Sequence, residues 1–146
     1  MVEEGRLIAI FGCWRNGHIT VNGTDLSDHA REITLETSVV ELPDNVHGDN
    51  TQKVRAGLED WTITVTFLQD FAASKVDATL DAAGGVAHAG FNVIVGADAA
   101  SVSTTNPRYS GSAILASYRP FGGQHGVNLE AQATFRPAGN LTRQTV

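Results

Sequence analysis

Alternation of apolar and polar residues in Asp60–Leu68, DWTITVTFL, restricts the fold of this chain more than any other feature. Side chains of an extended strand point to opposite faces in turn, so the stretch predicts a strand with one buried face and one polar face. The side chains expected in the core are Trp61, Ile63, Val65 and Phe67. Those expected on the opposite face are Thr62, Thr64 and Thr66.

The stretch REITLETSVVEL, residues 31–42, has the same period of two. Its apolar face comprises Ile33, Leu35 and Val39, of which we expect the first two in the core. Its polar face comprises Glu32, Thr34, Glu36 and Ser38. Pro43 ends this strand, because proline cannot donate a hydrogen bond to a sheet.

Other segments predict a short strand at His18–Val21, a strand FNVIVGA, and two strands, SGSAILASYRPF and VNLEAQATFRPA, joined as a hairpin through GGQHG. After Leu68 the period changes to that of a helix. Its apolar face would contain Phe71, Val76, Ala78 and Leu80. Asp70 would be its N-cap, and Gly84-Gly85 would end it.

A length of 146 residues indicates a single domain spanning the whole chain, and fifteen glycines with many Val, Thr and Ser residues favour β structure. Three parts stand outside this pattern: an N-terminal segment, 1–17, a long polar segment, 44–56, and a polar C-terminal tail, 138–146. The middle segment either is disordered or becomes ordered against another molecule. Its polar side chains are Asp44, Asn45, His47, Asp49, Asn50, Gln52, Lys53 and Arg55.

Several functional classes find no support in the sequence. A single cysteine excludes an internal disulfide, and five histidines without an i, i+4 pair argue against zinc, so we expect no metal and no cofactor. No catalytic motif is present, which argues against an enzyme. A net charge of −6 without a cluster of basic residues argues against a protein that binds nucleic acid tightly. We find neither a signal peptide nor a run of about 18 apolar residues, so no membrane association is expected.

Two features leave alternatives open. Asp25 and Asp28, with Asn22, could hold a cation or form an Asx-rich turn. Trp14 and Trp61 could stack on a sugar or base, or Trp61 could simply pack in the core. These residues leave open that the chain is a β-sandwich module that binds a ligand such as a carbohydrate, as an alternative to a self-assembling structural protein.

The order of three long stretches carries a resemblance. They are VNGTDLSDHAREITLE, HGDNTQKVRAGLEDWTITVTFLQDFAASKVDATL and TNPRYSGSAILASYRPFGGQHGVNLEAQATFRPAGNLTRQT. Together they resemble the major tail tube proteins of long-tailed, siphovirus-type bacteriophages. The more specific parts are Gly48-Asp49, Ala56-Gly57-Leu58, Asp60-Trp61, Gln69-Asp70-Phe71, Asn106-Pro107, Tyr109-Ser110-Gly111 and Leu141-Thr142-Arg143.

The resemblance implies a mainly β fold, a β-sandwich or open barrel with one short flanking helix. It implies homohexameric rings that stack into a hollow tube, with a continuous β-barrel around the lumen. The partners would be other copies of the chain, a tape measure protein, a tail terminator and tail tip or baseplate proteins. The genome would pass through the lumen without specific binding.

The same resemblance places the protein in the virion tail, assembled in the host bacterial cytoplasm. Segment 44–56 would order against a neighbouring subunit or ring. The residues expected to face the lumen are Glu32, Thr34, Glu36, Thr62, Thr64 and Thr66. Another tail component with a related fold, such as a terminator or baseplate hub, is a further alternative.

Overall fold

The computed structural model describes residues 17–73, 75–82, 89–98 and 100–145. It contains eight strands, one α-helix and one short 3-10 helix. The N-terminal half holds β1 His18–Val21, β2 Thr24–Asp25, η1 Ser27–His29, β3 Ala30–Pro43 and β4 Val54–Leu68. The remainder holds α1 Val76–Ala82, β5 Ala89–Gly96, β6 Arg108–Gly122, β7 Glu130–Pro137 and β8 Thr142–Gln144.

All of the strands belong to one antiparallel sheet in the order β2-β1-β5-β6-β7-β4-β3, and β8 pairs with β6. The sheet curls until buried side chains from both ends of this order share one core. Ile19 and Val21 of β1 pack there with Phe67 of β4, and Val76 and Leu80 of α1 cover the same cluster. The expected class, a mainly β open barrel with one short helix, is confirmed.

The core confirms the face expected for β4. Trp61 is 3% exposed, and its apolar neighbours two, four and six residues further along are fully buried. On β3 the expectation was only partly right. Ile33 and Leu35 pack against the core but are only partly buried, and Val39 is 47% exposed. The reason is position: β3 is the last strand of the order, so the closing sheet covers only part of its inner face.

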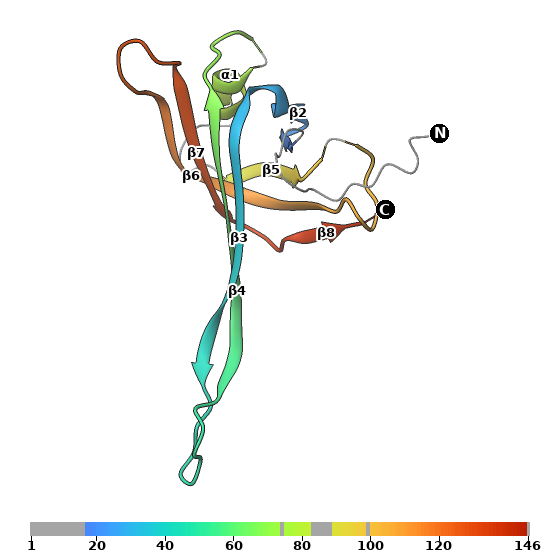
Figure 1. Ribbon diagram of the computed structural model, residues 1–146, viewed down its shortest axis with the longest axis vertical. Helices are drawn as coiled ribbons and strands as arrows, with labels where there is room; N and C mark the ends of the chain where they lie inside the picture. The colour runs from blue at the N-terminus through green and yellow to red at the C-terminus, as the bar shows by residue number, and fades with distance from the viewer. Residues whose placement is uncertain (1–16, 74, 83–88, 99, 146) are drawn as a thin grey trace.

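A long hairpin of β3 and β4 leaves the body of the molecule and projects from one end (Figure 1). β7 pairs with β4 only from Ile63 to Leu68, so beyond Ile63 the two long strands pair, among the described strands, only with each other. The polar loop is shorter than the expected segment 44–56, because Val54, Arg55 and Ala56 belong to β4 and pair with Pro43, Leu42 and Glu41.

The helix also begins later than expected. α1 starts at Val76, and Asp70 instead accepts a hydrogen bond from the Ala72 N–H at 2.9 Å, which closes a turn before the helix. Phe71 lies in that turn and is 57% exposed, so it is not a core residue. The expected helix end at Gly84-Gly85 lies outside the described residues.

Two further features differ slightly from expectation. The hairpin of β6 and β7 has residues 123–129 as its loop, and Gly123 and Gly126 there have φ values of 129° and 89°, which favour glycine. The C-terminal tail contributes β8, which extends the sheet beside β6. None of the described helices is long and apolar enough to cross a membrane.

Candidate functional site

The six side chains expected to face a lumen lie together on one face of the sheet. Each glutamate or threonine of β3 is directly opposite a threonine of β4. The pairs are Glu32 with Thr66, Thr34 with Thr64, and Glu36 with Thr62. The three β3 residues are exposed and the three threonines of β4 are partly buried. The sequence therefore predicted correctly which side chains share this face, here called the polar face.

The polar face continues over β7 and β6. Gln132 and Thr134 of β7 lie opposite Thr66 and Thr64, and Arg119 of β6 lies opposite Gln132. Arg136 of β7 donates hydrogen bonds to Thr62 and to Asp60, the latter at 3.1 Å. Sequence reasoning missed these two arginines. They mean that the glutamates of the polar face share it with basic groups, so its charge is mixed rather than simply acidic.

A register shift between Ala30 and Glu32 inserts Arg31 as an extra residue at one end of this face. Its guanidinium forms an ion pair with Glu130 of β7, 2.7 Å away. The bulge thus ties the first residues of β3 to β7 across β4. Both side chains are partly exposed, so we assign the pair a role in alignment rather than a large contribution to stability.

The free edges of the sheet lie at the two sides of the polar face. In the described part of the chain β3 pairs only with β4, which leaves its other edge open. On the far side, β5 pairs with β6 only from Arg108 to Ile114, whereas β7 pairs with β6 as far as Gly122. Among the residues that the structure describes, the four-strand section β6-β7-β4-β3 therefore ends in a strand edge without a paired strand on each side. Such edges are templates for pairing with another chain.

Apolar side chains crowd the projecting hairpin, although no core reaches it. We define the arm as residues 39–58. Six of its large apolar side chains are between 45% and 83% exposed: Val39, Val40, Leu42, Val46, Val54 and Leu58. Large apolar side chains exposed in this number on one projecting hairpin favour an interaction surface. The sequence analysis named the polar residues of segment 44–56 as the interface and gave these six no interface role, although two of them, Val46 and Val54, stand out as apolar residues within that polar segment.

The polar side chains at the arm tip bond mainly to one another. Asp49 accepts a hydrogen bond from the Val46 N–H at 2.9 Å and pairs with Lys53 at 3.2 Å. Asp44 pairs with Arg55 at 3.0 Å. Asn45 accepts from the Lys53 N–H. These contacts fold the tip on itself and engage five of its eight polar side chains, which leaves the exposed apolar side chains of the arm as the groups for which the described contacts give no role.

The arm approaches its own partner strand closely at Gly57. A second register shift, between Val39 and Glu41, lies beside it. A Cβ atom at position 57 would lie 2.9 Å from the backbone oxygen of Val40, closer than such atoms approach in proteins. Glycine is therefore required for the two strands to remain paired where the arm leaves the body.

The alternative of a ligand site at Trp61 is not supported by its surroundings. The indole is buried, and its Nε1–H donates to the Gly139 oxygen at 3.1 Å. It packs so tightly on β6 that a Cβ atom at Gly111 would lie 2.9 Å from its ring. Trp61 is thus a core residue, as the preferred interpretation expected, and cannot stack on a sugar. Trp14 lies outside the described residues.

The Asx-rich turn has bonding partners within the protein. Asp25 accepts from the Ser27 N–H at 2.9 Å, and Asn22 accepts from the Asn92 N–H at 2.7 Å. Asp28 bonds to His29. Among the residues that the structure describes, no group of three or more His, Cys, Asp or Glu side chains is arranged to hold a metal ion. The turn interpretation is therefore the one that these contacts favour.

One ionisable cluster links η1 to the turn before α1. The His29 ring contacts Asp28 at 2.8 Å through Nδ1 and Asp70 at 3.0 Å through Nε2. The bond to Asp28 raises the pKa of His29, burial opposes this, and the bond to Asp70 adds to it. The Ala72 N–H and then His29 lower the pKa of Asp70. The cluster holds two segments together and presents no open position for chemistry.

Comparisons of sequence with known proteins give no match: no model of a protein family and no curated protein is similar to the chain. Comparison with solved structures does give matches. A chain of the virion of a native gene transfer agent particle has a TM-score of 0.68 at 12% identity, over 88% of this chain and 95% of that one. The SPP1 tail tube has a TM-score of 0.67 at 11% identity, over 90% and 76%.

A chain of the anti-feeding prophage baseplate, determined with six-fold symmetrisation, has a TM-score of 0.63 at 10% identity, over 94% of this chain and 98% of that one. At these identities the similarity shows a shared fold. The resemblance to tail tube proteins is confirmed at that level, since the neighbours are parts of phage-tail-like particles.

Proposed function

We propose that this chain is a non-enzymatic structural protein that forms the tube of a bacteriophage tail. Copies would assemble into hexameric rings, and the rings would stack into a hollow tube for the genome. The observation that carries this proposal is the arm: a two-stranded projection with six exposed apolar side chains, attached to the fold shared with the SPP1 tail tube. An isolated two-stranded hairpin is at best marginally stable in water, so the arm needs a second surface.

Ring formation would use the two free edges. The open edge of β3 on one copy would pair with the open part of β6 on the next, so that β6-β7-β4-β3 of each copy continues into its neighbour. Because the two edges are different surfaces, the contact is head-to-tail, and it generates a ring when the rotation closes. Closure removes the unpaired edges that otherwise invite aggregation. Six copies match the symmetry applied to the structurally similar baseplate.

Stacking of rings would use the arm. The arm projects away from the body of its own subunit (Figure 1), so it would reach a neighbouring subunit or ring. Burying the six apolar side chains there would supply the driving force, at roughly 25 cal/mol for each Å² of apolar surface removed from water. The polar residues first expected to make this contact would then shape the tip, as their mutual bonds indicate.

The polar face would line the lumen, because ring closure through β3 and β6 places one face of β6-β7-β4-β3 inward. Threonines and paired charges suit this position. A uniformly basic wall would bind the phosphates of DNA, whose duplex carries one charge for about 1.7 Å of length. A wall in which Glu32 and Glu36 alternate with threonines leaves DNA free to slide. A tape measure protein would occupy the same channel during assembly, and a terminator and tip proteins would close its ends.

Electron microscopy and sedimentation of the purified protein test this proposal. We expect tubes or rings from the natural sequence. The variant Val54→Asp with Leu58→Asp should remain folded, with an unchanged unfolding temperature, and should form no tubes, because charges replace the apolar arm contacts. The matched control is Thr51→Asp with Gln52→Asp, which adds the same charge at exposed polar positions of the same loop. Dispersed monomers from the natural sequence, or equal assembly of all three proteins, would contradict it.

The baseplate neighbour favours one second candidate, a ring in the baseplate or tip of such a particle. The same images separate the two. A tube protein gives cylinders of many rings, whereas a baseplate ring gives single discs at every concentration tested.

A further inference from the structure

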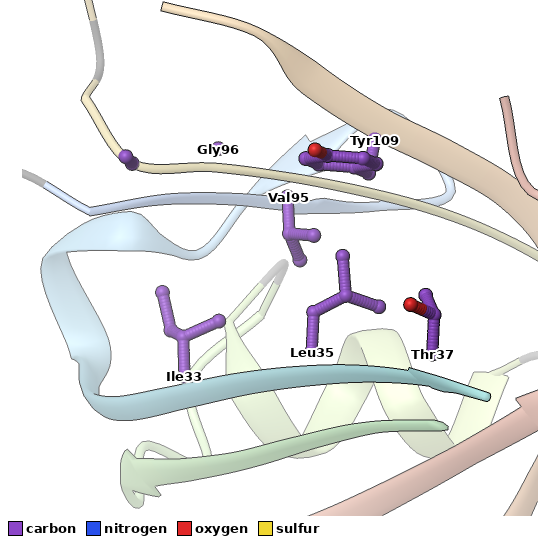
Figure 2. Close-up of a pocket in the computed structure, with 7 residues that line it drawn as sticks. Ile33, Leu35, Thr37, Val95, Gly96 and Tyr109 are labelled. Atoms are coloured by element: carbon purple, nitrogen blue, oxygen red, sulfur yellow. The ribbon is translucent and has the colours of Figure 1, made fainter. Parts of the chain in front are cut away.

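A groove on the opposite side of β3 from the polar face is not used by the proposed function. Figure 2 shows Ile33, Leu35 and Thr37 pointing from β3 toward Val95 and Tyr109, which come from β5 and β6. The cavity has a volume of about 320 Å³. It explains why Ile33 and Leu35, expected in the core, are only partly buried: the groove separates them from the opposite wall.

The lining of the groove indicates the chemistry of its occupant. Gly96 and Ala97 complete the set of seven lining residues, and none of the seven carries a charge. The Tyr109 hydroxyl accepts a hydrogen bond from Arg143 Nε at 3.2 Å, so this polar group already has a partner. The Thr37 hydroxyl is the one other side-chain polar group among the seven. The groove therefore fits a short run of aliphatic or aromatic side chains rather than a polar ligand.

The start of the described chain lies beside this groove. His18, the first residue of β1, pairs with Gly96, and β1 runs antiparallel to β5. Continuing backward from His18, the chain therefore moves in the direction from Gly96 to Ala97, both of which line the groove. The described part of the chain therefore begins beside two residues that line this cavity.

The residues before this start contain an apolar run to which the proposed function assigns no role. Leu7–Phe11 reads LIAIF, five consecutive apolar residues between Arg6 and Gly12. Residues 12–17 join this run to His18, and six extended residues reach about 20 Å. The linker is therefore long enough for the run to turn back into the groove beside which it starts.

We propose that Leu7–Phe11 of each chain docks in the groove between β3 and β5 of the same chain. The occupant is this segment rather than another copy because a short tether keeps it at a local concentration on the order of millimolar. Docking covers Ile33 and Leu35 and completes the core on the side where the sheet stays open. The proposal is independent of tube assembly, because every contact lies within one subunit.

Disulfide trapping in the full-length chain tests this directly. In a Cys13→Ser background, Ile10→Cys is combined with Thr37→Cys, on the groove wall. The matched control combines Ile10→Cys with Thr34→Cys, which replaces the same residue type on the same strand but on the polar face. The tethers are nearly equal in length, so undirected collision gives similar rates. Docking should make the Thr37→Cys pair form its disulfide at least about tenfold faster within one chain.

Two further measurements keep the test decisive. Mixing chains that carry only one of the two cysteines reports transfer between subunits: cross-links there, without cross-links within a chain, would overturn the proposal in favour of a neighbour's segment. NMR of the labelled natural sequence should show contacts between methyl groups of Leu7–Ile10 and those of Ile33 and Leu35. Equal disulfide rates for the two pairs, or the absence of these methyl contacts, would also overturn it.

Discussion

Gly111 and Trp61 provide the sharpest test of how the arm is attached to the body. Trp61 lies on β4 close to where the arm begins, and Gly111 of β6 faces its ring. In Gly111→Ala the new Cβ would lie 2.9 Å from Trp61 Cζ2 and 3.2 Å from Cη2. The indole cannot simply move away, since it is 3% exposed and bonded to the Gly139 oxygen. One added methyl group must therefore displace either the ring or β6.

The loss of folding stability in Gly111→Ala has two parts. Inserting a methyl group into a packed site costs about 1–3 kcal/mol. Losing the bond from Trp61 Nε1 to Gly139 adds roughly 1 kcal/mol. We expect the free energy of unfolding of Gly111→Ala to fall by about 2–4 kcal/mol, a large part of a typical total of 5–15 kcal/mol. Urea unfolding of dilute protein measures this as a lower midpoint with an unchanged slope.

A double-mutant cycle identifies the cause. Trp61→Phe removes the ring edge that carries Cζ2 and Cη2 and leaves the Asn140 backbone oxygen, at 3.2 Å, as the remaining close contact. In that background the cost of Gly111→Ala should therefore fall by about 1 kcal/mol or more. The matched control is Gly139→Ala, where the new Cβ would meet Ser112 at 3.6 Å, an ordinary contact. We expect this control to change stability by less than about 0.5 kcal/mol. Equal costs for Gly111→Ala and Gly139→Ala, or an undiminished cost beside Trp61→Phe, would refute the reasoning.

Three other predictions concern the arm, the ionisable cluster and the polar face. Gly57→Ala should abolish tube formation, as seen by electron microscopy, while the unfolding midpoint of the body stays near that of the natural protein, because its Cβ would meet the Val40 oxygen at 2.9 Å; normal tubes would show that the strands tolerate the shift. The folded-state pKa of His29 is raised above 6.5, so its contribution to stability is complete below that pH and is lost as pH rises through the folded value. The unfolding temperature should therefore fall between about pH 6 and 8 relative to His29→Gln, and parallel curves for the two proteins would exclude this. In virus particles, Glu32→Lys with Glu36→Lys should slow DNA ejection, with a defect that shrinks as salt rises; normal ejection at low salt would place these residues away from the lumen.

The strand around Trp61 was predictable because its surroundings impose a period of two. One face of Asp60–Leu68 meets the core and the other does not, so the pattern indicates both the strand and its buried side. The same argument placed the glutamates and threonines of β3 and β4 on one face, and the register confirms it. Where a core lies on one side of a strand only, the sequence alone predicts the strand and which of its faces is buried.

The extent of the arm was not predictable, because the arm has no core on either side. Beyond Val39 no core lies on either side, so the alternation carries no information about which residues pair. Val54 and Arg55 therefore read as loop although they are strand. The depth of burial of Ile33 was hidden in a similar way, because it depends on how far β5 closes over β3 and not on the local pattern.

The position of Arg119 on the polar face depends on bulges in β6, the strand that carries it. Register shifts between Leu115 and Ser117 and between Arg119 and Gly122 set which residues of that strand face outward. A bulge changes the phase of the alternation, and no rule of composition fixes where it falls. The mixed charge of the face therefore needed the three-dimensional structure.

The separation of the arm from the rest of the sheet makes its reach adjustable. Of the strands that the structure describes, only β3 and β4 pair beyond Ile63, so adding two residues to each strand of the arm would disturb none of the others. Each such addition lengthens the arm by about 7 Å and leaves every side chain on its original face. Adding a single residue to each strand would instead exchange the two faces. Descendants of one body could thus differ in the reach of the arm by discrete steps, with the core unchanged.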